Sequence, residues 1–223
     1  MNFEDVLNIY HLKRQTETGF NFIGEIFQEI KEQYLAETTA KDKNQSWNAW
    51  SGKALEKLIE YSIKEFIETC GYPVALTSYC VLKRKKLSDK LETVKKNIAV
   101  SYAKAPIVPN VDLILYDQNS CQVISLLFCQ ASLRERVVQA AYWKIKLGDK
   151  QIRCYLVSTD NEQDFVQEGQ NSSRNRIIVE HGEIDGAYIF GDIPESGKIK
   201  KFDRMFPDLT SIFKGWFDSK QNF

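Results

Sequence analysis

The fold of this chain is decided by residues 110–130, which read NVDLILYDQNSCQVISLLFCQ. Two strongly apolar runs, 111–116 and 122–129, stand on either side of the polar residues 117–120. Short apolar runs separated by a turn-like polar segment are typical of a β-hairpin. Because the hydrophobicity of both runs is nearly continuous, we expect strands that are covered on both faces.

The segments around this hairpin predict an α/β fold, with a mixed sheet flanked by helices. A broad apolar face indicates a helix that starts near residue 46 or 51 and ends before Gly71. Residues 73–82 are rich in β-forming side chains and indicate a strand before the hairpin. The segments after the hairpin predict a helix at 132–148, strands at 152–158, 177–180 and 186–190, and an amphipathic helix at 202–217.

The first part of the chain predicts a helical arm. Apolar residues recur at helical spacing between residues 3 and 36, which indicates one or two amphipathic helices. Residues 37–45 are polar and charged, as is typical of a linker. We therefore predict an N-terminal arm over residues 1–45 and a main domain over residues 46–223. The arm and the C-terminal helix would pack around the sheet or mediate dimerisation.

The overall charge of the chain excludes a strong general attraction to a polyanion. Thirty basic residues balance thirty acidic ones, so any surface that binds a polyanion must be local. A basic run at 83–86 opens a charged stretch that continues through Lys96. Such a run forms either a solvated surface or a contact to phosphate groups.

The cysteines and the N-terminus indicate a reducing compartment. The five cysteines are odd in number and no two form a CxxC pair, so neither a disulfide framework nor a zinc site is indicated. The first residues lack the layout of a signal peptide, and no apolar run reaches membrane-spanning length. We expect a cytoplasmic protein with no membrane contact.

Asp112 is a candidate metal ligand. It stands at the beginning of an apolar strand, where a charged side chain is costly unless something binds it. Hard oxygen ligands of this kind hold divalent cations that polarise a phosphate and activate a water. The alternative is an aspartate whose hydrogen bonds are satisfied within the protein.

A set of motifs surrounds Asp112. Residues 132–136 read SLRER, follow the polar Gln130, and precede the aromatic pair Tyr142 and Trp143. Upstream, residues 45–56 read QSWNAWSGKALE. Over residues 46–143 and in this order, the motifs resemble restriction endonucleases of the PD-(D/E)-x-K superfamily that read CC/GG-containing sites. The BsaWI-like and EcoRII-like enzymes are closest in pattern, and the resemblance implies a restriction-endonuclease-like α/β core.

The resemblance implies a type II restriction endonuclease that binds double-stranded DNA at a specific sequence, usually as a homodimer. Such an enzyme hydrolyses a phosphodiester with Mg²⁺ and leaves 5′-phosphate and 3′-hydroxyl ends. On this pattern Asp112 and Glu56 hold the Mg²⁺, with the main-chain carbonyl of Cys129 as a further ligand. Glu60, one helical turn after Glu56, is either a substitute for it or an exposed helical glutamate.

Arg134, Glu135 and Arg136 take the position of base-reading residues in the resembled enzymes. Arginine offers a bidentate pair of donors to guanine, and a carboxylate accepts a hydrogen bond from cytosine. The three residues would therefore suit adjacent G·C pairs in a major groove. The alternative is a solvated first helical turn that carries intrahelical ion pairs.

The chain departs from the pattern at Gln130, which occupies the position of the catalytic lysine, and at Phe128, two residues earlier. A glutamine cannot orient or activate the attacking water as an ammonium does. Three hypotheses follow: the site is active with Gln130, the chain is an inactive form, or Lys144 supplies the missing lysine. A non-catalytic DNA-binding protein of the same fold is therefore the alternative function. A third alternative for the function is a scaffold or small-molecule-binding protein, in which the apolar strands only form the core.

Overall fold

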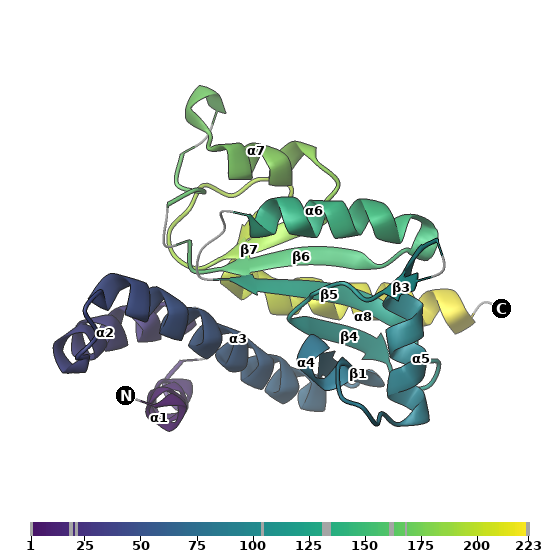
Figure 1. Cartoon of the computed structure of the whole chain (residues 1–223), viewed down its shortest axis with the longest axis horizontal. Coiled ribbons are helices and arrows are strands. Elements are labelled where there is room, and N and C mark those ends of the chain that lie inside the picture. Colours follow the sequence, from purple (N-terminus) through teal and green to yellow (C-terminus); the bar gives the residue numbers. More distant parts are fainter. Residues whose placement is uncertain are drawn as a thin grey trace.

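The computed structural model is built around a six-stranded sheet with the strand order β1-β4-β5-β6-β7-β8 (Figure 1). It describes residues 2–17, 20, 22–103, 105–130, 135–160, 163–167 and 169–221. The first three strands pair antiparallel, whereas β5 to β8 pair parallel, which confirms the predicted mixed sheet. The strands are β1 (Val74–Ser78), β4 (Leu113–Asp117), β5 (Val123–Gln130), β6 (Arg153–Ser158), β7 (Gly186–Ile189) and β8 (Ile199–Lys201).

The predicted hairpin of β4 and β5 is present, and both of its faces are buried. Every residue of β4 is buried, as is every residue of β5 except Gln130. Leu127 and Cys129 belong to the apolar cluster on one face of the sheet, whereas Leu126 and Phe128 belong to the cluster on the other. Successive side chains of a strand point to opposite faces, so a strand covered on both sides is hydrophobic almost throughout.

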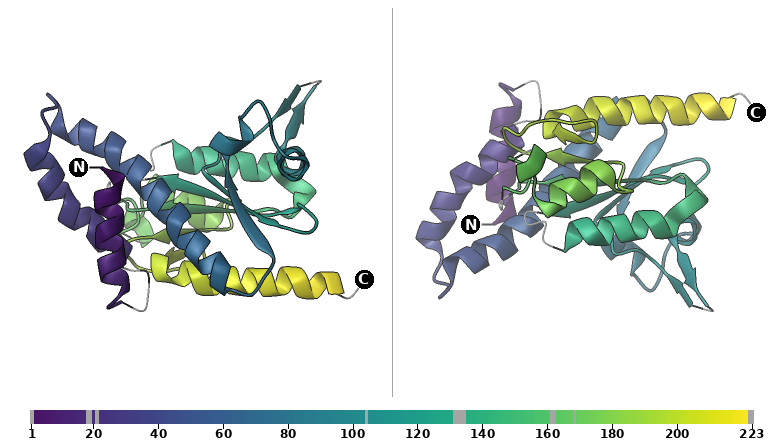
Figure 2. Two further views of the ribbon diagram at one scale, coloured as in Figure 1. Left: turned by 90° about the horizontal axis from the view of Figure 1, so that it is seen from below. Right: turned by 90° about the horizontal axis from the view of Figure 1, so that it is seen from above.

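Helices cover both faces of the sheet, as Figures 1 and 2 show. α3 (Lys43–Thr69) and α8 (Met205–Gln221) share the apolar cluster of one face. On the other face the cluster takes in α5 (Asp89–Ile98), α6 (Arg136–Leu147) and α7 (Arg174–His181). α3 begins earlier than predicted because the Asp42 carboxylate accepts a 2.9 Å hydrogen bond from the Gln45 main-chain N–H.

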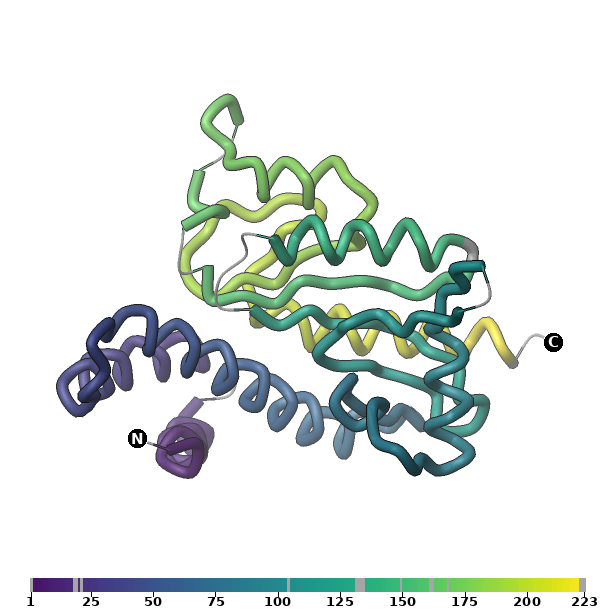
Figure 3. The backbone as a smooth tube through the Cα atoms, viewed as in Figure 1, coloured from purple at the N-terminus to yellow at the C-terminus, as the bar shows by residue number. Residues whose placement is uncertain are grey.

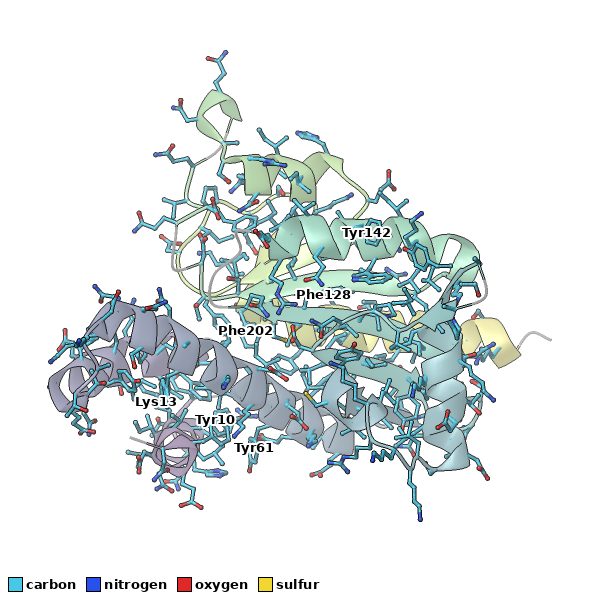
Figure 4. The ribbon with its side chains drawn as sticks, viewed as in Figure 1. Tyr10, Lys13, Tyr61, Phe128, Tyr142 and Phe202 are labelled. Carbon is cyan, nitrogen blue, oxygen red and sulfur yellow. The ribbon has the colours of Figure 1, made fainter. Side chains whose placement is uncertain are left out.

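Two helices at the start of the chain, α1 (Phe3–Arg14) and α2 (Phe22–Glu37), pack against α3. The Tyr10 hydroxyl of α1 donates a 3.0 Å hydrogen bond to Glu65 of α3. Figure 4 shows Tyr10 and Tyr61 close together between these helices, and their ring centroids are 5.4 Å apart. The backbone tube in Figure 3 shows α3 running without a break from the arm to the sheet. The division into an arm at 1–45 and a domain at 46–223 stays a prediction.

One predicted strand is wrong and another is too long. Residues 177–180 lie in α7, which begins because the Ser173 hydroxyl accepts a 3.0 Å hydrogen bond from the Arg176 N–H. The strand predicted at 73–82 ends at Ser78, and α4 (Tyr79–Leu82) follows as a single helical turn. Short apolar runs do not distinguish a strand from a buried helical turn, which explains both errors.

The remaining elements lie outside the sequence-based expectations. The charged stretch after residue 86 contains α5, where the Ser88 hydroxyl accepts a 3.4 Å hydrogen bond from the Leu91 N–H. β2 (Val100–Tyr102) and β3 (Ala105–Ile107) form a separate short hairpin. Three 3-10 turns complete the fold, namely η1 (Gly148–Lys150), η2 (Gly169–Asn171) and η3 (Phe202–Arg204). None of the described helices is both long and apolar enough to cross a membrane.

Candidate active site

Asp112 lies at the edge of the sheet where β4 begins and β5 ends. Its Oδ2 atom accepts a 2.8 Å hydrogen bond from the main-chain N–H of Cys129. Leu113, the next residue, pairs with Leu127 in the ladder of β4 and β5, so this bond continues the ladder through a side chain. The carboxylate is thereby fixed against the carboxyl end of β5.

The surroundings of Asp112 raise the pKa of its carboxyl group above the usual value. Burial is the main cause, while hydrogen bonds from the Cys129 N–H and the Gln130 side chain and the charge of Arg136 act in the opposite direction. A carboxylate that burial destabilises in this way gains from a nearby cation. A carboxylate at this position therefore has the chemistry of a metal ligand.

Glu56 faces the same edge of the sheet from the middle of α3. Burial raises the pKa of Glu56, and the negative charges of Asp112 and Glu60 raise it further, while Arg136 and Lys57 lower it. The mutual effect of Glu56 and Asp112 means that the two carboxylates are close enough to repel each other. Like charges that share a site are stabilised by a cation between them or by a proton on one of them.

Gln130 and Cys129 form the floor of this site at the end of β5. Gln130 pairs with Ser158 of β6, and its side chain is close enough to Asp112 to lower the pKa of that carboxyl group. Burial raises the pKa of the Cys129 thiol well above its usual value, and the charges of Asp112 and Glu56 raise it further. The thiol is therefore neutral at physiological pH, so the oxygen of its main-chain carbonyl is the ligand that this residue can offer.

The three predicted base-reading residues are only partly described. Arg134 lies outside the described residues, because positions 131–134 are not among them. Glu135 is exposed just before α6, and Arg136 is the first residue of that helix and half-buried. The Arg136 Nη1 atom donates a 3.0 Å hydrogen bond to Gln139. Its charge lowers the pKa of both Asp112 and Glu56, so Arg136 lies close to the carboxylates, a position that the sequence alone did not suggest.

Lys144 does not belong to this site. Its Nζ atom donates a 2.8 Å hydrogen bond to the carbonyl of Ile152 and forms a 2.8 Å ion pair with Asp185. Ile152 precedes β6, whereas Gln130 pairs with Ser158 at the other end of that strand. At about 3.3 Å per residue, the two ends are roughly 20 Å apart. The hypothesis that Lys144 replaces the missing lysine is therefore not supported.

The oxygen atoms gathered here fit Mg²⁺, although no complete metal cage is present. Among the described residues, no group of three histidine, cysteine, aspartate or glutamate side chains is placed to hold a metal ion. Protein sites for Mg²⁺ typically use one or two carboxylates and leave the other positions to water and substrate phosphate. Asp112 and Glu56 match that requirement. Glu60 lies one helical turn after Glu56 and forms a 2.6 Å ion pair with Lys64.

A cavity of about 620 Å³ opens between α2, α3 and the carboxyl ends of β6 and β7, and neither Asp112 nor Glu56 lines it. Trp47 and Ser51 line it, and both precede Glu56 on α3. Thr159 and Asp160 line it from the segment directly after β6. No sequence pattern predicts this cavity, because its walls come from segments more than a hundred residues apart in the chain.

The chain is similar to known restriction endonucleases. The family model described as BsaWI restriction endonuclease type 2 matches residues 90–208, which include Asp112 and Gln130 but not Glu56. A protein of Methanocaldococcus jannaschii named type II restriction enzyme MjaVIP is 30% identical over 197 residues, which are 82% of this chain and 86% of that protein. A Helicobacter pylori protein named type II restriction enzyme HpyAORF263P is 27% identical over 118 residues, which are 51% and 60% of the two chains.

Among solved structures, the restriction endonuclease AgeI in complex with DNA has a similar fold. The match has a TM-score of 0.52 at 14% sequence identity and covers 86% of this chain and 76% of the other. At so low an identity the likeness concerns the fold alone. It confirms the predicted restriction-endonuclease-like core, a mixed sheet flanked by helices.

Proposed function

Because this chain belongs to the BsaWI family of type II restriction endonucleases, we propose that it binds a specific sequence in double-stranded DNA and hydrolyses a phosphodiester there. The products would carry 5′-phosphate and 3′-hydroxyl ends. The observation that carries the proposal is the meeting of Asp112 and Glu56 at the carboxyl end of β5. Duplex DNA as the partner is supported by the AgeI structure, which contains DNA.

In this proposal Asp112, Glu56 and the main-chain carbonyl of Cys129 hold Mg²⁺. When bound, Mg²⁺ supplies the polarisation of the phosphate that makes it open to attack. The chain contributes a fixed ligand geometry, because the Cys129 N–H holds one oxygen of Asp112. Both carboxylates are partly buried, and partial burial strengthens their attraction to a cation.

Gln130 acts as a positioning residue in the proposed reaction. Its side chain lowers the pKa of Asp112 and would help to orient the carboxylate that faces the metal. An amide carries no charge, so the step that a lysine assists in related folds must rely on other groups here. The alternative function is a DNA-binding protein of the same fold that does not cleave, and the glutamine at position 130 is the observation that favours it.

Sequence recognition is proposed for Arg134, Glu135 and Arg136 at the start of α6. Guanidinium groups and a carboxylate provide the donors and acceptor that G·C pairs present in the major groove. A homodimer is proposed as well, because a two-fold protein matches a two-fold DNA site. The cytoplasm, where the proposed substrate is accessible, is the proposed location, and the arm at residues 1–45 remains a proposed separate unit.

The decisive experiment incubates the purified chain with plasmid DNA and Mg²⁺ or Mn²⁺. Discrete fragments are expected from the wild-type chain, and Asp112→Asn should reduce cleavage by at least about 100-fold, the scale on which removal of one electrostatic group acts. Asp192→Asn, which alters an exposed aspartate far along the chain, is the matched control and should cut normally. A gel shift without fragments would support the non-catalytic alternative, and the absence of any DNA binding would contradict both functions.

A further inference from the structure

The charged stretch between α4 and the end of α5 concentrates positive charge in a neutral protein. Residues 83–96 contain seven basic and two acidic residues, whereas the whole chain has thirty of each. The rest of the chain therefore carries an excess of acid. Such a local concentration of positive charge attracts polyanions to this part of the surface, although the protein as a whole carries no net charge.

The four consecutive cations at 83–86 are all exposed. In the part of the chain that the structure describes, no residue of 83–96 takes part in an ion pair with a carboxylate. The Lys83 ammonium lies 4.2 Å from the centroid of the Tyr79 ring, and Lys90 donates a 3.2 Å hydrogen bond to the carbonyl of Gln118. Arg84, Lys85 and Lys86 thus present three adjacent positive charges to solvent.

The path of the chain connects this basic segment to the sheet edge that carries Asp112. Ser78, the last residue of β1, pairs with Leu113, which directly follows Asp112. The single turn of α4 comes next, and the basic segment begins at Lys83. With about 1.5 Å per helical residue and at most about 3.6 Å per extended residue, Lys86 is no more than roughly 20 Å along the chain from Ser78. A duplex that extends some six base pairs from the edge spans a similar length, at about 3.4 Å per base pair.

We propose that Arg84, Lys85 and Lys86 bind backbone phosphates of duplex DNA outside the cleavage site. This inference rests on the proposed function and adds a contact to it. The three side chains lie before residue 90, where the family match begins. Three unpaired cations side by side repel one another, and phosphates along a DNA backbone relieve that repulsion while releasing counterions.

An anionic membrane is a poorer partner for this segment. Amphipathic basic segments that insert into the membrane interface combine cations with exposed apolar side chains that enter the lipid. None of the large exposed apolar side chains among the described residues falls within 83–96, since these are Leu12, Ile107, Val138, Tyr142, Ile145, Val166 and Ile177. Contacts through charge alone suit a DNA backbone.

The test measures how the binding of duplex DNA depends on salt, without divalent cations so that no cleavage occurs. The probe is a random-sequence duplex, and binding is followed by fluorescence anisotropy between about 50 and 200 mM salt. The triple variant Arg84→Gln, Lys85→Gln, Lys86→Gln should lower the slope of log affinity against log salt by about two to three, near one for each lost contact. The matched control changes one exposed arginine and two exposed lysines elsewhere, Arg204→Gln, Lys41→Gln and Lys214→Gln, and should leave the slope unchanged.

Three outcomes distinguish a failure of this inference from a failure of the proposed function. If the triple variant and the control have the same slope as the wild-type chain, the inference is wrong while the nuclease proposal stands. If the triple variant loses affinity for anionic lipid vesicles but not for the duplex, the inference is wrong as well. If the wild-type chain binds no duplex at any salt concentration, the proposed function fails and this contact fails with it. Plasmid cleavage by the triple variant at low salt should give the wild-type fragments.

Discussion

The main-chain N–H of Cys129 donates a 2.8 Å hydrogen bond to the Asp112 carboxylate. The donor belongs to the backbone of β5, so no side-chain substitution on that strand other than proline at position 129 removes it. The carboxylate therefore keeps its place even when the neighbouring side chains differ from those of other enzymes with this fold. This robustness allows the role of each surrounding side chain to be tested separately.

Gln130→Ala should shift the acid limb of the pH profile for cleavage to higher pH. The Gln130 side chain lowers the pKa of Asp112, so its removal leaves a carboxyl group that ionises later as pH rises. Gln130→Lys should shift the limb the other way, because an ammonium favours the ionised carboxylate. Single-turnover rates across pH measure both shifts. A large gain in rate for Gln130→Lys would mark the wild-type chain as a disabled form, and a limb that stays in place in both variants would contradict the assigned hydrogen bond.

Glu56→Gln should stabilise the metal-free protein at neutral pH. The pKa of Glu56 is raised in the folded state, so the folded chain holds more protons than the unfolded one at pH values between the two pKa values. The free energy of unfolding therefore falls as pH rises through that window, which begins near the usual glutamate pKa of about 4.3. Glutamine does not ionise, so Glu56→Gln avoids this loss of stability.

Thermal unfolding in EDTA at several pH values measures the effect of Glu56→Gln. The difference in stability between the variant and the wild-type chain should vanish at pH values below this window and reach its full size above it. Added Mg²⁺ should stabilise the wild-type chain more than the variant, because binding to the folded state raises its stability. Glu68→Gln on the exposed side of α3 is the control, and an equal response from both variants would argue against a site at Glu56.

Arg136→Gln should raise the pKa of both carboxyl groups. Arg136 is a positive charge that lowers the pKa of Asp112 and of Glu56, so its loss should move the acid limb of cleavage to higher pH. If Arg136 also reads a base, discrimination at one base pair should fall by about 1–3 kcal/mol. Rates on matched DNA substrates across pH separate the two effects. Arg174→Gln, at the exposed start of α7, should change neither.

Asp117→Ala should destabilise the fold by about 1.5–3 kcal/mol, the usual contribution of hydrogen bonds to a charged group. The buried Asp117 carboxylate accepts hydrogen bonds from Lys220 at 2.8 Å and from the Ser120 hydroxyl at 2.6 Å. Burial alone would raise the pKa of Asp117, but these hydrogen bonds hold it well below the usual range. The stabilisation is present above the unfolded pKa of about 3.9 and is lost as pH falls below it.

Urea denaturation of Asp117→Ala and the wild-type chain at neutral and acidic pH checks this expectation. The difference in the free energy of unfolding between the two chains should become smaller as the pH falls. Asp218→Ala, which alters a more exposed aspartate on α8, should stay within about 0.5 kcal/mol of the wild-type chain. A gap that widened in acid would contradict the low pKa of Asp117.

The central part of the fold could be predicted because its pattern is local. The hairpin of β4 and β5 follows from two apolar runs and one polar turn, and both of its faces are buried as expected. Helix starts were harder, since α3 and α7 begin where a single side chain, Asp42 or Ser173, satisfies a free N–H group. Such caps compete with several polar neighbours in sequence, and only packing decides among them.

The candidate site was less accessible to sequence reasoning. Asp112 stood out because a charge at the start of an apolar strand is costly, but Glu56 came only from the family resemblance. Nothing in the sequence states that the middle of α3 faces the start of β4, because that approach depends on how a helix packs across a sheet. The same reason explains why Lys144 was a candidate and why the closeness of Arg136 to the carboxylates was missed.

The continuity of α3 has a mechanical consequence. The helix is about 40 Å long and stiff. α1 and α2 pack against it, and Glu56 lies near its midpoint. Asp112, by contrast, is anchored to the sheet. A displacement of α1 and α2 that carries α3 with it would alter the gap between the two carboxylates, and with it the affinity of the proposed Mg²⁺ site. A label on α1, followed while Mg²⁺ is added, should report that coupling.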